Sequence, residues 1–366
     1  MSGMTPKQIL ALELDRVQQD RQIREHRLSH LYWECTMRCN LDCRHCGTTC
    51  QRLDNLGDMP LRDFLAVLDN IAQSEDPHDV FVTLTGGEPF TRTDLAVCGR
   101  EIYRRGYAWG VVTNGLAFDE QLFHTLVDNG LQSITISLDG LEHEHNWLRA
   151  NPDSFACASE AIRVAAHERR VETIVVTHVN QRNIDYLPQL ADYLRSLGAT
   201  EWQLQTLFPA GRAKNDKELL LEDYQMENLM EFIKSQRETN ANAAEGTLAM
   251  HVSYGCEGFL GQYEGKVRDG FYSCQAGISK GCVRTNGDIG GCPTISYKYS
   301  QGNIYEGDEF MDVWNTCFDP YRKRDWLHKG ICTHCKVFRY CRAGSMHLRD
   351  DEGTLLQCNY FCLNRR

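Results

Sequence analysis

Six apolar, strand-like segments alternate with six amphipathic, helix-like segments along the first two thirds of the chain, and this alternation restricts the fold more than any other feature. The strand-like segments are short and rich in Val, Ile, Thr and aromatic residues, which is typical of buried parallel strands. We predict strands at 30–35, 79–85, 108–113, 133–138, 172–179 and 202–207, and helices at 60–73, 94–105, 119–129, 154–168, 183–197 and 221–239. The pattern predicts an α/β fold in the form of a partial, open barrel of six parallel strands, because six repeats are too few to close an eight-stranded barrel.

The two ends of the chain differ from this repeating region. Residues 5–27 are polar and have helical periodicity, with Thr5 as the predicted N-cap and Pro6 at the first helical position. After about Asn240 the periodicity fades, glycines become frequent, and ten of the 17 cysteines fall between Cys256 and Cys362. A segment with so many loops buries too little apolar surface to be stable on its own. We therefore expect metal ligands to cross-link it. We expect an N-terminal helix at 1–29, a barrel at 30–240 and a small cysteine-rich domain at 241–366.

The composition excludes several classes of function. The net charge of −11 argues against a nucleic-acid partner, because phosphate binding requires a basic surface. No segment approaches the roughly 18 consecutive apolar residues of a membrane span, and the polar N-terminus has no apolar signal-peptide core. We therefore expect a cytoplasmic protein. In that compartment 17 cysteines, an odd number in a long chain, are better explained as metal ligands than as a disulfide scaffold.

Three of the cysteines lie in one short loop after the first predicted strand. Cys39, Cys43 and Cys46 are separated by three and then two residues. Four thiolates normally complete a 4Fe–4S cube or a tetrahedral zinc site, so this loop is one ligand short. A cube held by three thiolates leaves one iron open to a small molecule, which is what reductive cleavage of S-adenosylmethionine requires.

Polar residues follow the next three predicted strands as well. Thr85-Gly-Gly-Glu-Pro89 ends the second strand, Thr113-Asn-Gly115 the third and Ser137-Leu-Asp-Gly140 the fourth. The paired glycines allow close approach of the backbone to a ligand, and Glu88 offers a charge for an ammonium group. Each segment alone is compatible with a simple turn. Parallel strands end at one rim of the sheet. The recurrence of polar segments after three successive strands therefore favours a shared ligand site.

With these segments in place, the chain from about Tyr32 to Pro209 resembles the radical S-adenosylmethionine (radical SAM) enzymes. The CxxxCxxC loop, the Gly-Gly-Glu-Pro segment and the Ser-Leu-Asp-Gly segment occur in the order found in that family. The resemblance implies that the three loop cysteines bind a 4Fe–4S cluster whose open iron takes the amino and carboxylate groups of S-adenosylmethionine. Reduction then cleaves this cofactor to methionine and a 5′-deoxyadenosyl radical, which abstracts hydrogen from the substrate.

The resemblance also assigns cofactor contacts by position. Gly86, Gly87 and Glu88 match the residues that contact the amino group of S-adenosylmethionine. Ser137 matches a ribose contact, and Arg149 matches a residue that pairs with the carboxylate.

Five further residues are weaker candidates. Asn114 belongs to the same rim, and His45, just before the third cysteine, either lies over the adenine or is packed in its loop. Thr177 and Asn180 after the fifth strand, and Leu207 after the sixth, are candidates for ribose and adenine contacts. Ordinary rim packing is the alternative for these last three.

The cysteine-rich tail contains two groups of candidate metal ligands. The first group is Cys274, Cys282 and Cys292, and the second is Cys332, Cys335 and Cys341 with Cys358 and Cys362. Spacing alone does not decide between zinc and iron–sulfur. The segment resembles the SPASM extension of radical SAM enzymes, in which Cys274, Gly287 and Cys292 precede a CxxC pair. That resemblance implies two auxiliary 4Fe–4S clusters, and three clusters in all.

The tail departs from the SPASM pattern at two positions. A cysteine is expected four residues after Cys341, but Ser345 stands there. The first auxiliary cluster then takes its fourth ligand from Cys362, Cys256, the Ser345 oxygen, a nearby carboxylate or a substrate thiolate. Anaerobic sulfatase-maturing enzymes place an acidic residue after the cysteine that matches Cys292, whereas Pro293 follows here. A base would have to come from elsewhere, for example Asp139 or Glu257.

These observations give one leading hypothesis and several alternatives. The leading one is a radical SAM/SPASM oxidoreductase that modifies a peptide or protein, by a crosslink or dehydrogenation as in the maturation of ribosomally made peptides. It implies a peptide substrate, a small redox protein as electron donor, and leader binding by the barrel or by a separate peptide-recognition protein. The alternatives are a sulfatase-maturase-like enzyme, a small-molecule dehydrogenase, or a non-catalytic iron–sulfur electron carrier or zinc scaffold.

Overall fold

The computed structural model describes residues 4–47, 57–241 and 249–364. Within them the strands form one open sheet in the order β10-β9-β8-β1-β2-β3-β4-β5-β6-β7. Neighbouring strands from β8 through β1 to β7 are parallel, and only β9 and β10 add antiparallel pairs at one edge. The predicted fold, an α/β architecture with an unclosed, mostly parallel sheet, is confirmed.

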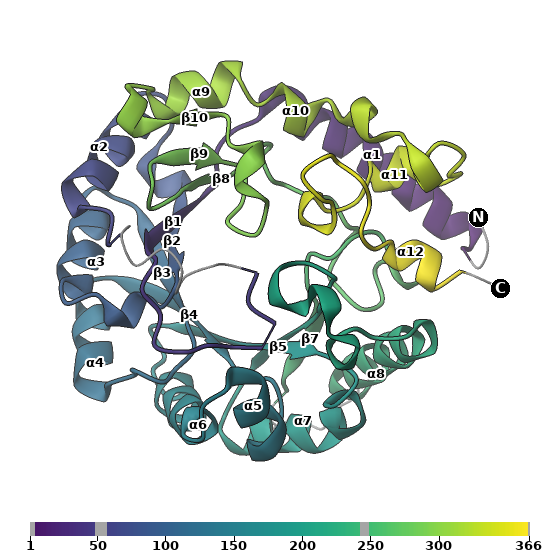
Figure 1. Ribbon diagram of the computed structural model, residues 1–366, viewed down its shortest axis with the longest axis horizontal. Coiled ribbons are helices and arrows are strands. Elements are labelled where there is room, and N and C mark those ends of the chain that lie inside the picture. Colours follow the sequence, from purple (N-terminus) through teal and green to yellow (C-terminus); the bar gives the residue numbers. More distant parts are fainter. Residues whose placement is uncertain (1–3, 48–56, 242–248, 365–366) are drawn as a thin grey trace.

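The strands curve around a central opening, and the helices lie outside them (Figure 1). The strands are β1 His30–Thr36, β2 Phe81–Gly86, β3 Ala108–Thr113, β4 Leu131–Ser137, β5 Glu172–Val179, β6 Glu201–Thr206, β7 His251–Tyr254, β8 Lys280–Val283, β9 Asp288–Gly290 and β10 Gly302–Asn303. The helices of the repeating region are α2 Leu61–Ile71, α3 Leu95–Arg104, α4 Glu120–Asp128, α5 Glu142–Arg149, α6 Ser154–Ala166, α7 Leu187–Ser196 and α8 Asp223–Ala241. All six predicted strands and six predicted helices are present, with boundaries shifted by a few residues.

The sheet continues beyond the six predicted strands in both directions. After residue 240 the chain adds β7 beside β6 and returns to place β8 beside β1. Both strands have only four residues, and no helical repeat separates them, which is why the alternation did not reveal them. The segment at 241–366 therefore shares its sheet with the barrel that precedes it. The sequence analysis also missed α5, a short and strongly charged helix.

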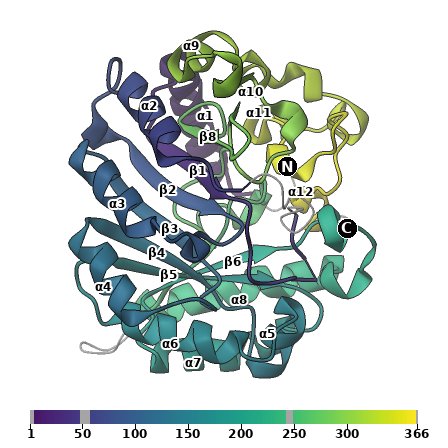
Figure 2. The same cartoon turned by 60° about the vertical axis from the view of Figure 1, so that its left-hand side comes forward.

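The core lies between the sheet and the outer helices, which Figure 2 shows covering the face of β1–β6. Trp33 of β1 stacks on Phe64 of α2 with ring centroids 4.1 Å apart, and both are fully buried. Because successive strand residues point to opposite faces, Tyr32 and Glu34 must then point into the opening. Cys98 of α3 and Cys35 of β1 are buried packing residues. Cys317, by contrast, is exposed at the C-cap of α9 (Phe310–Thr316).

The N-terminal helix α1 (Pro6–Glu25) packs against the cysteine-rich tail. Thr5 caps it as predicted, in a capping box with Gln8, although the helix ends before residue 27 because His26 turns into the left-handed region. Tyr340 of α11 (Phe338–Cys341) donates a 2.6 Å hydrogen bond to Glu13, and Arg342 pairs with Asp20. The remaining tail helices are α10 Asp319–Arg322 and α12 Asn359–Cys362. No helix in the described residues is long and apolar enough to span a membrane.

Candidate active site and metal centres

The loop that carries the three predicted cluster ligands leaves β1 and crosses the opening of the sheet (Figure 1). Its far side is held by two backbone hydrogen bonds, from Arg44 N to Leu148 O at 2.9 Å and from Arg212 N to Cys46 O at 3.3 Å. Cys43 is buried and the other two cysteines are half-buried. The three thiols interact electrostatically with one another, so the loop gathers them in one place. Burial raises the pKa of Cys39 to about 11 and that of Cys43 above its ordinary value.

The Gly-Gly-Glu-Pro segment is packed directly against the start of this loop. Gly87 N donates to Thr36 O and Glu88 N donates to Arg38 O, both at 2.8 Å. Gly86 has φ +138°, and a Cβ atom on it would lie 2.1 Å from Thr36 O. A Cβ atom on Gly87 would lie 2.1 Å from Arg38 O. The glycines are therefore required by the close approach of two backbones, one of which leads directly into Cys39.

This approach predicts a loss of stability for Gly87→Ala. The added methyl collides with backbone and not with a movable side chain, so the two segments must separate, at a cost of about 1–3 kcal/mol of unfolding free energy. Urea unfolding of the wild type and the variant measures this cost. Gly47→Ala is the matched control, since a Cβ atom there meets nothing within 4 Å. Equal stabilities of the Gly87 and Gly47 variants would contradict the prediction.

Glu88 is a buried carboxylate held by donors from two strand ends. Its oxygens accept hydrogen bonds from Phe90 N at 3.1 Å, Thr113 Oγ1 at 2.8 Å and Asn114 N at 2.7 Å. Burial raises the pKa of Glu88, and these donors with Arg149 offset only part of that rise. Asn114 also donates through Nδ2 to Asn40 Oδ1 at 2.8 Å, which ties the end of β3 to the residue after Cys39. Sequence reasoning missed Asn40, which no motif marks.

Arg149 links the fourth strand end to the cysteine loop. Its Nε donates to Asp139 Oδ2 at 2.6 Å, and its Nη1 lies 3.9 Å from Cys43 Sγ. Burial alone would raise the pKa of Asp139, but the Arg149 charge and the hydrogen bond from His178 hold it well below its usual range. The Nη2 of Arg149 is buried without a hydrogen-bond partner, so one donor of a charged group is available at this site.

Two histidines lie beside this pair. His45 and His178 have ring centroids 4.8 Å apart, and the Nδ1 of His45 is buried without a hydrogen-bond partner. His178 donates its backbone N–H to Asp139 Oδ1 at 2.9 Å. Burial lowers the pKa of His45 well below its ordinary value, so this ring is neutral. A neutral ring with an open nitrogen suits an aromatic ligand with polar edges, such as a purine.

Of the other predicted cofactor contacts, most are engaged in hydrogen bonds or packing within the protein. Ser137 is buried at the end of β4, on the same rim. The Thr177 hydroxyl donates to Leu138 O at 2.5 Å and accepts from Trp202 Nε1 at 2.9 Å, which favours a packing role. Asn180 shapes a turn by accepting from Arg182 N at 2.9 Å. Leu207 packs with Leu148 in a small apolar cluster beside the loop.

The rim residues fit a three-thiolate cluster and a charged cofactor beside it. The donor set is three clustered thiols, two closely packed glycines, one buried carboxylate, and two buried nitrogen atoms without partners. No three His, Cys, Asp or Glu side chains in the described residues converge closely enough for a single metal ion.

The first tail group lies around β8, against β1. Cys282 is on β8 in register with Tyr32 of β1, and it interacts electrostatically with Cys292, which in turn interacts with Cys274. Burial raises the pKa of all but one of these thiols. For Cys274, Arg324 and the N–H groups of Met346 and Ala276 outweigh burial and hold the pKa below its ordinary value.

The second tail group surrounds a cavity of about 290 Å³. The four thiols that line it are Cys332, Cys335, Cys341 and Cys358. Each of them interacts electrostatically with others of the four, and Arg349 Nη2 lies 3.5 Å from Cys332 Sγ. Cys362, on α12, does not line this cavity. Between Cys358 and Cys362, which the spacing left open, the cavity therefore favours Cys358.

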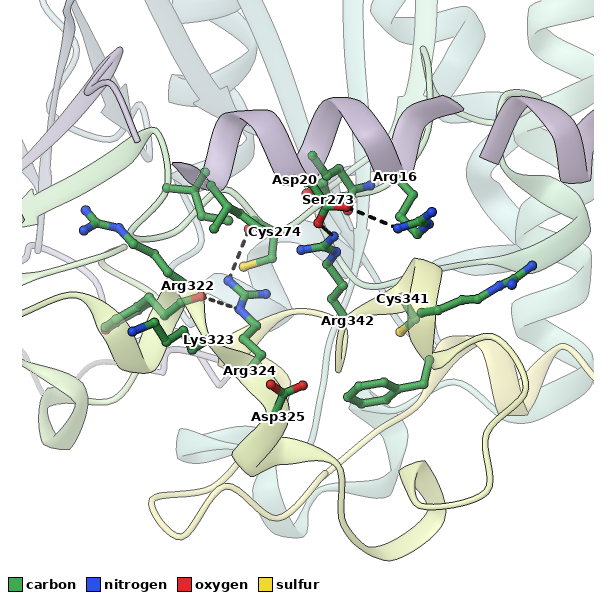
Figure 3. Close-up of a pocket in the computed structure, with 16 residues that line it drawn as sticks. Arg16, Asp20, Ser273, Cys274, Arg322, Lys323, Arg324, Asp325, Cys341 and Arg342 are labelled. Atoms are coloured by element: carbon green, nitrogen blue, oxygen red, sulfur yellow. Dashed lines mark hydrogen bonds and ion pairs between the residues drawn. The ribbon is translucent and has the colours of Figure 1, made fainter. Parts of the chain in front are cut away.

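A basic cavity of about 500 Å³ separates the two tail groups (Figure 3). Cys274 of the first group and Cys341 of the second both line it, between α1 and the tail. Its charged lining residues are Arg16, Arg322, Lys323, Arg324, Arg339 and Arg342 against Asp20 and Asp325. Of these residues, Arg324 lowers the pKa of Cys274 and so stabilises negative charge on the first group.

Comparisons with known proteins agree with this geometry. Residues 33–194 match the family model described as the Radical SAM superfamily. The chain is 26% identical over 322 residues to an AdoMet-dependent heme synthase of Oleidesulfovibrio alaskensis, covering 84% of this chain and 80% of that protein. It is also 26% identical over 323 residues to mycofactocin maturase MftC of Mycolicibacterium smegmatis, covering 86% of this chain and 77% of the relative.

Solved structures show the same fold. Native anSMEcpe with bound AdoMet superposes with a TM-score of 0.70 at 20% identity, over 92% of this chain and 94% of the other. Streptococcus suis SuiB bound to its precursor peptide SuiA superposes with a TM-score of 0.67 at 15% identity, over 97% and 81%. With the three-thiol loop and its rim residues, these matches identify residues 33–194 as a radical SAM domain, and the solved structures share the fold of nearly the whole chain.

Proposed function

We propose that this enzyme oxidatively modifies a peptide or protein. The observation that carries the proposal is the assembly of the three-thiol loop, Glu88 and Arg149 at one rim of the sheet, in a chain that resembles mycofactocin maturase over most of its length. The fold shared with SuiB, which was solved with its precursor peptide, is consistent with it.

Cys39, Cys43 and Cys46 would hold the 4Fe–4S cluster at the rim. When bound, this cluster and S-adenosylmethionine supply an electron, reductive cleavage of the sulfonium, and abstraction of hydrogen from the substrate. Glu88 accepts hydrogen bonds from residues at the end of β3 and offers a negative charge to an ammonium group. Gly86 and Gly87 let that group approach the backbone.

Four other rim residues complete the proposed cofactor site. The open Nη2 of Arg149 suits a carboxylate, and His45 presents a neutral ring for the adenine. Ser137 is proposed for the ribose, and Asn114 fixes the loop through Asn40. The burial of Glu88 and Arg149 keeps water from the charged groups, which strengthens their interactions with a ligand.

Glu257 is better suited than Asp139 to take a proton from an oxidised substrate. Asp139 is fully buried, ion-paired with Arg149, and has a lowered pKa, so it is a weak base. Burial raises the pKa of Glu257, and Thr206 N at 2.5 Å and Tyr254 OH at 2.9 Å fix its carboxylate at the ends of β6 and β7. A raised pKa brings a carboxylate closer to the range in which general bases act.

We further propose that the tail holds two auxiliary 4Fe–4S clusters, one at each cysteine group. The second cluster has a complete set of four thiols around its cavity, and the first has Cys274, Cys282 and Cys292. The proposed division is a barrel at 30–240 and an auxiliary domain at 241–366, with β7 and β8 binding the two into one sheet. Auxiliary clusters would accept the electron left on the substrate after hydrogen abstraction, giving a net oxidation such as a crosslink or a dehydrogenation.

A small-molecule oxidation is the second candidate, because the chain is equally similar to a heme synthase. A sulfatase-maturase role has less support, since Pro293 follows Cys292 and offers no side-chain proton acceptor. A small redox protein as electron donor and a separate peptide-recognition protein complete the proposed partners.

The proposal predicts S-adenosylmethionine cleavage and a peptide product. The protein is reconstituted anaerobically with iron and sulfide, reduced, and given S-adenosylmethionine, and 5′-deoxyadenosine is measured. Small peptides encoded beside its gene are then added, and mass spectrometry checks them for the loss of hydrogen atoms. Absence of 5′-deoxyadenosine overturns the enzyme assignment. Cleavage that porphyrins stimulate and peptides do not supports the second candidate.

A further inference from the structure

We infer that Cys256 supplies the fourth thiolate of the first auxiliary cluster. It replaces the cysteine expected at position 345, where this chain has Ser345. The inference rests on the proposed function, since it presupposes that Cys274, Cys282 and Cys292 hold a cluster. Ligation exchanges the thiol proton of Cys256 for an iron–sulfur bond and releases that proton to water, with no change in oxidation state.

Cys256 and Ser345 lie side by side although 89 positions separate them in the sequence. Ser345 is buried, and its hydroxyl donates a 2.7 Å hydrogen bond to the carbonyl oxygen of Cys256. The next residue, Met346, donates its backbone N–H to the thiol of Cys274. A side chain at either position, 256 or 345, is therefore next to the first cysteine group.

The hydrogen bonds of Ser345 exclude its oxygen as the ligand. A hydroxyl has one proton, and Ser345 gives it to the Cys256 carbonyl. The contact between the Ser345 and Tyr272 hydroxyls then requires Tyr272 to be the donor. Both groups are thus neutral, and burial raises the pKa of Tyr272 well above its ordinary value, which also opposes a phenolate ligand.

The thiol of Cys256 lies near those of Cys292 and Cys274. It interacts electrostatically with Cys292 and with Cys274, and Tyr32 of β1 interacts with Cys256, Cys282 and Cys292 together. Cys256 is also exposed, so its thiol is accessible to a cluster. The four thiols are therefore neighbours beside Tyr32 of β1.

The backbone on both sides of Cys256 is fixed. Gly255 N donates to Leu204 O at 2.8 Å, which continues the pairing of β6 with β7. The Glu257 carboxylate accepts hydrogen bonds from Thr206 N and Tyr254 OH, which hold the residue in place. A second competing carboxylate, Glu34 near Cys282, already accepts a hydrogen bond from Tyr297 OH at 3.1 Å. A thiol held in place is better prepared to bind iron than a carboxylate that must first break its hydrogen bonds.

The test counts iron in the tail alone. A background variant with Cys39, Cys43 and Cys46 all changed to Ala removes the rim cluster, so about eight iron atoms per chain are expected from two auxiliary clusters. In that background Cys256→Ala is expected to lose between about one and four iron atoms, and to show the EPR signal of a three-iron cluster if a remnant survives. Cys317→Ala, at an exposed cysteine outside both groups, is the control and is expected to keep all of them.

Ser345→Cys provides the rescue. Because residues 345 and 256 are in direct contact, a cysteine at 345 in the Cys256→Ala protein is expected to restore iron content and the four-iron spectrum. Restoration also shows that the loss did not come from misfolding. Iron content and spectrum of Cys256→Ala equal to those of the Cys317 control overturn the inference while leaving the proposed function intact. A background variant with about four iron atoms or fewer overturns the proposed pair of auxiliary clusters, on which the inference rests.

Discussion

Changing Cys43 to Ala is expected to abolish S-adenosylmethionine cleavage and to remove about four iron atoms per chain. Cys43 is the buried member of the three-thiol loop and the one that contacts Arg149, whose Nη1 lies 3.9 Å from Cys43 Sγ. Two thiolates cannot hold a cube that already lacks a fourth protein ligand. The measurements are the iron content of the reconstituted protein and 5′-deoxyadenosine formed under reducing, anaerobic conditions.

Cys157→Ala is the matched control for this prediction. Cys157 lies half-buried on α6, away from all three cysteine groups, and its replacement is expected to leave iron content and cleavage at the wild-type level. Cleavage by Cys43→Ala at the rate of the Cys157 variant would refute the assignment of the rim loop as the reactive site. A loss of iron by both variants would show a general failure of reconstitution.

The repeating part of the fold could be predicted because its signals are local. Each of the first six strands contains apolar, β-branched or aromatic residues and lies between helix-like segments, and β3 and β5 have the predicted ends. The pairing of β8 with β1 could not be predicted. β8 has only four residues, including Gly281 and Cys282, and these show no alternation of apolar and polar residues. That pairing is fixed by tertiary contacts between segments far apart in the chain, such as His30 with Lys280, which sequence periodicity does not record.

The residues of the candidate site likewise fall into those that local sequence motifs predicted and those that they did not. Residues in short motifs, such as Glu88 and the three loop cysteines, were found from spacing, and the structure brings them to one rim. Asn40 and His178 were missed, because their roles depend on contacts to residues distant in the sequence, Asn114 for the first and Asp139 for the second. Thr177 was a candidate on position alone, and its saturated hydroxyl shows why position does not reveal hydrogen-bond partners.

Replacing Asp139 with Asn is expected to lower the free energy of unfolding by about 3–5 kcal/mol, because it leaves the buried Arg149 guanidinium without its counter-charge. The amide nitrogen of Asn would also face a donor, either Arg149 Nε–H or His178 N–H. Urea unfolding measures the loss. Asp128→Asn is the matched control, since Asp128 pairs with Arg170 on the surface and such pairs contribute about 0–1 kcal/mol. Equal stabilities of the two variants would contradict this account of the buried pair.

The same pair predicts how stability depends on pH. The pKa of Asp139 is depressed in the folded protein, so the unfolded chain binds its proton first as the pH falls. The stabilisation from Arg149 is therefore fully present above the ordinary aspartate pKa of about 4 and is lost as the pH falls below it toward the folded value. Wild-type stability is expected to fall more steeply below about pH 4 than that of Asp139→Asn, which has no proton to bind at this position. Parallel curves for the two proteins in that range would show that Asp139 does not carry the acid dependence of stability.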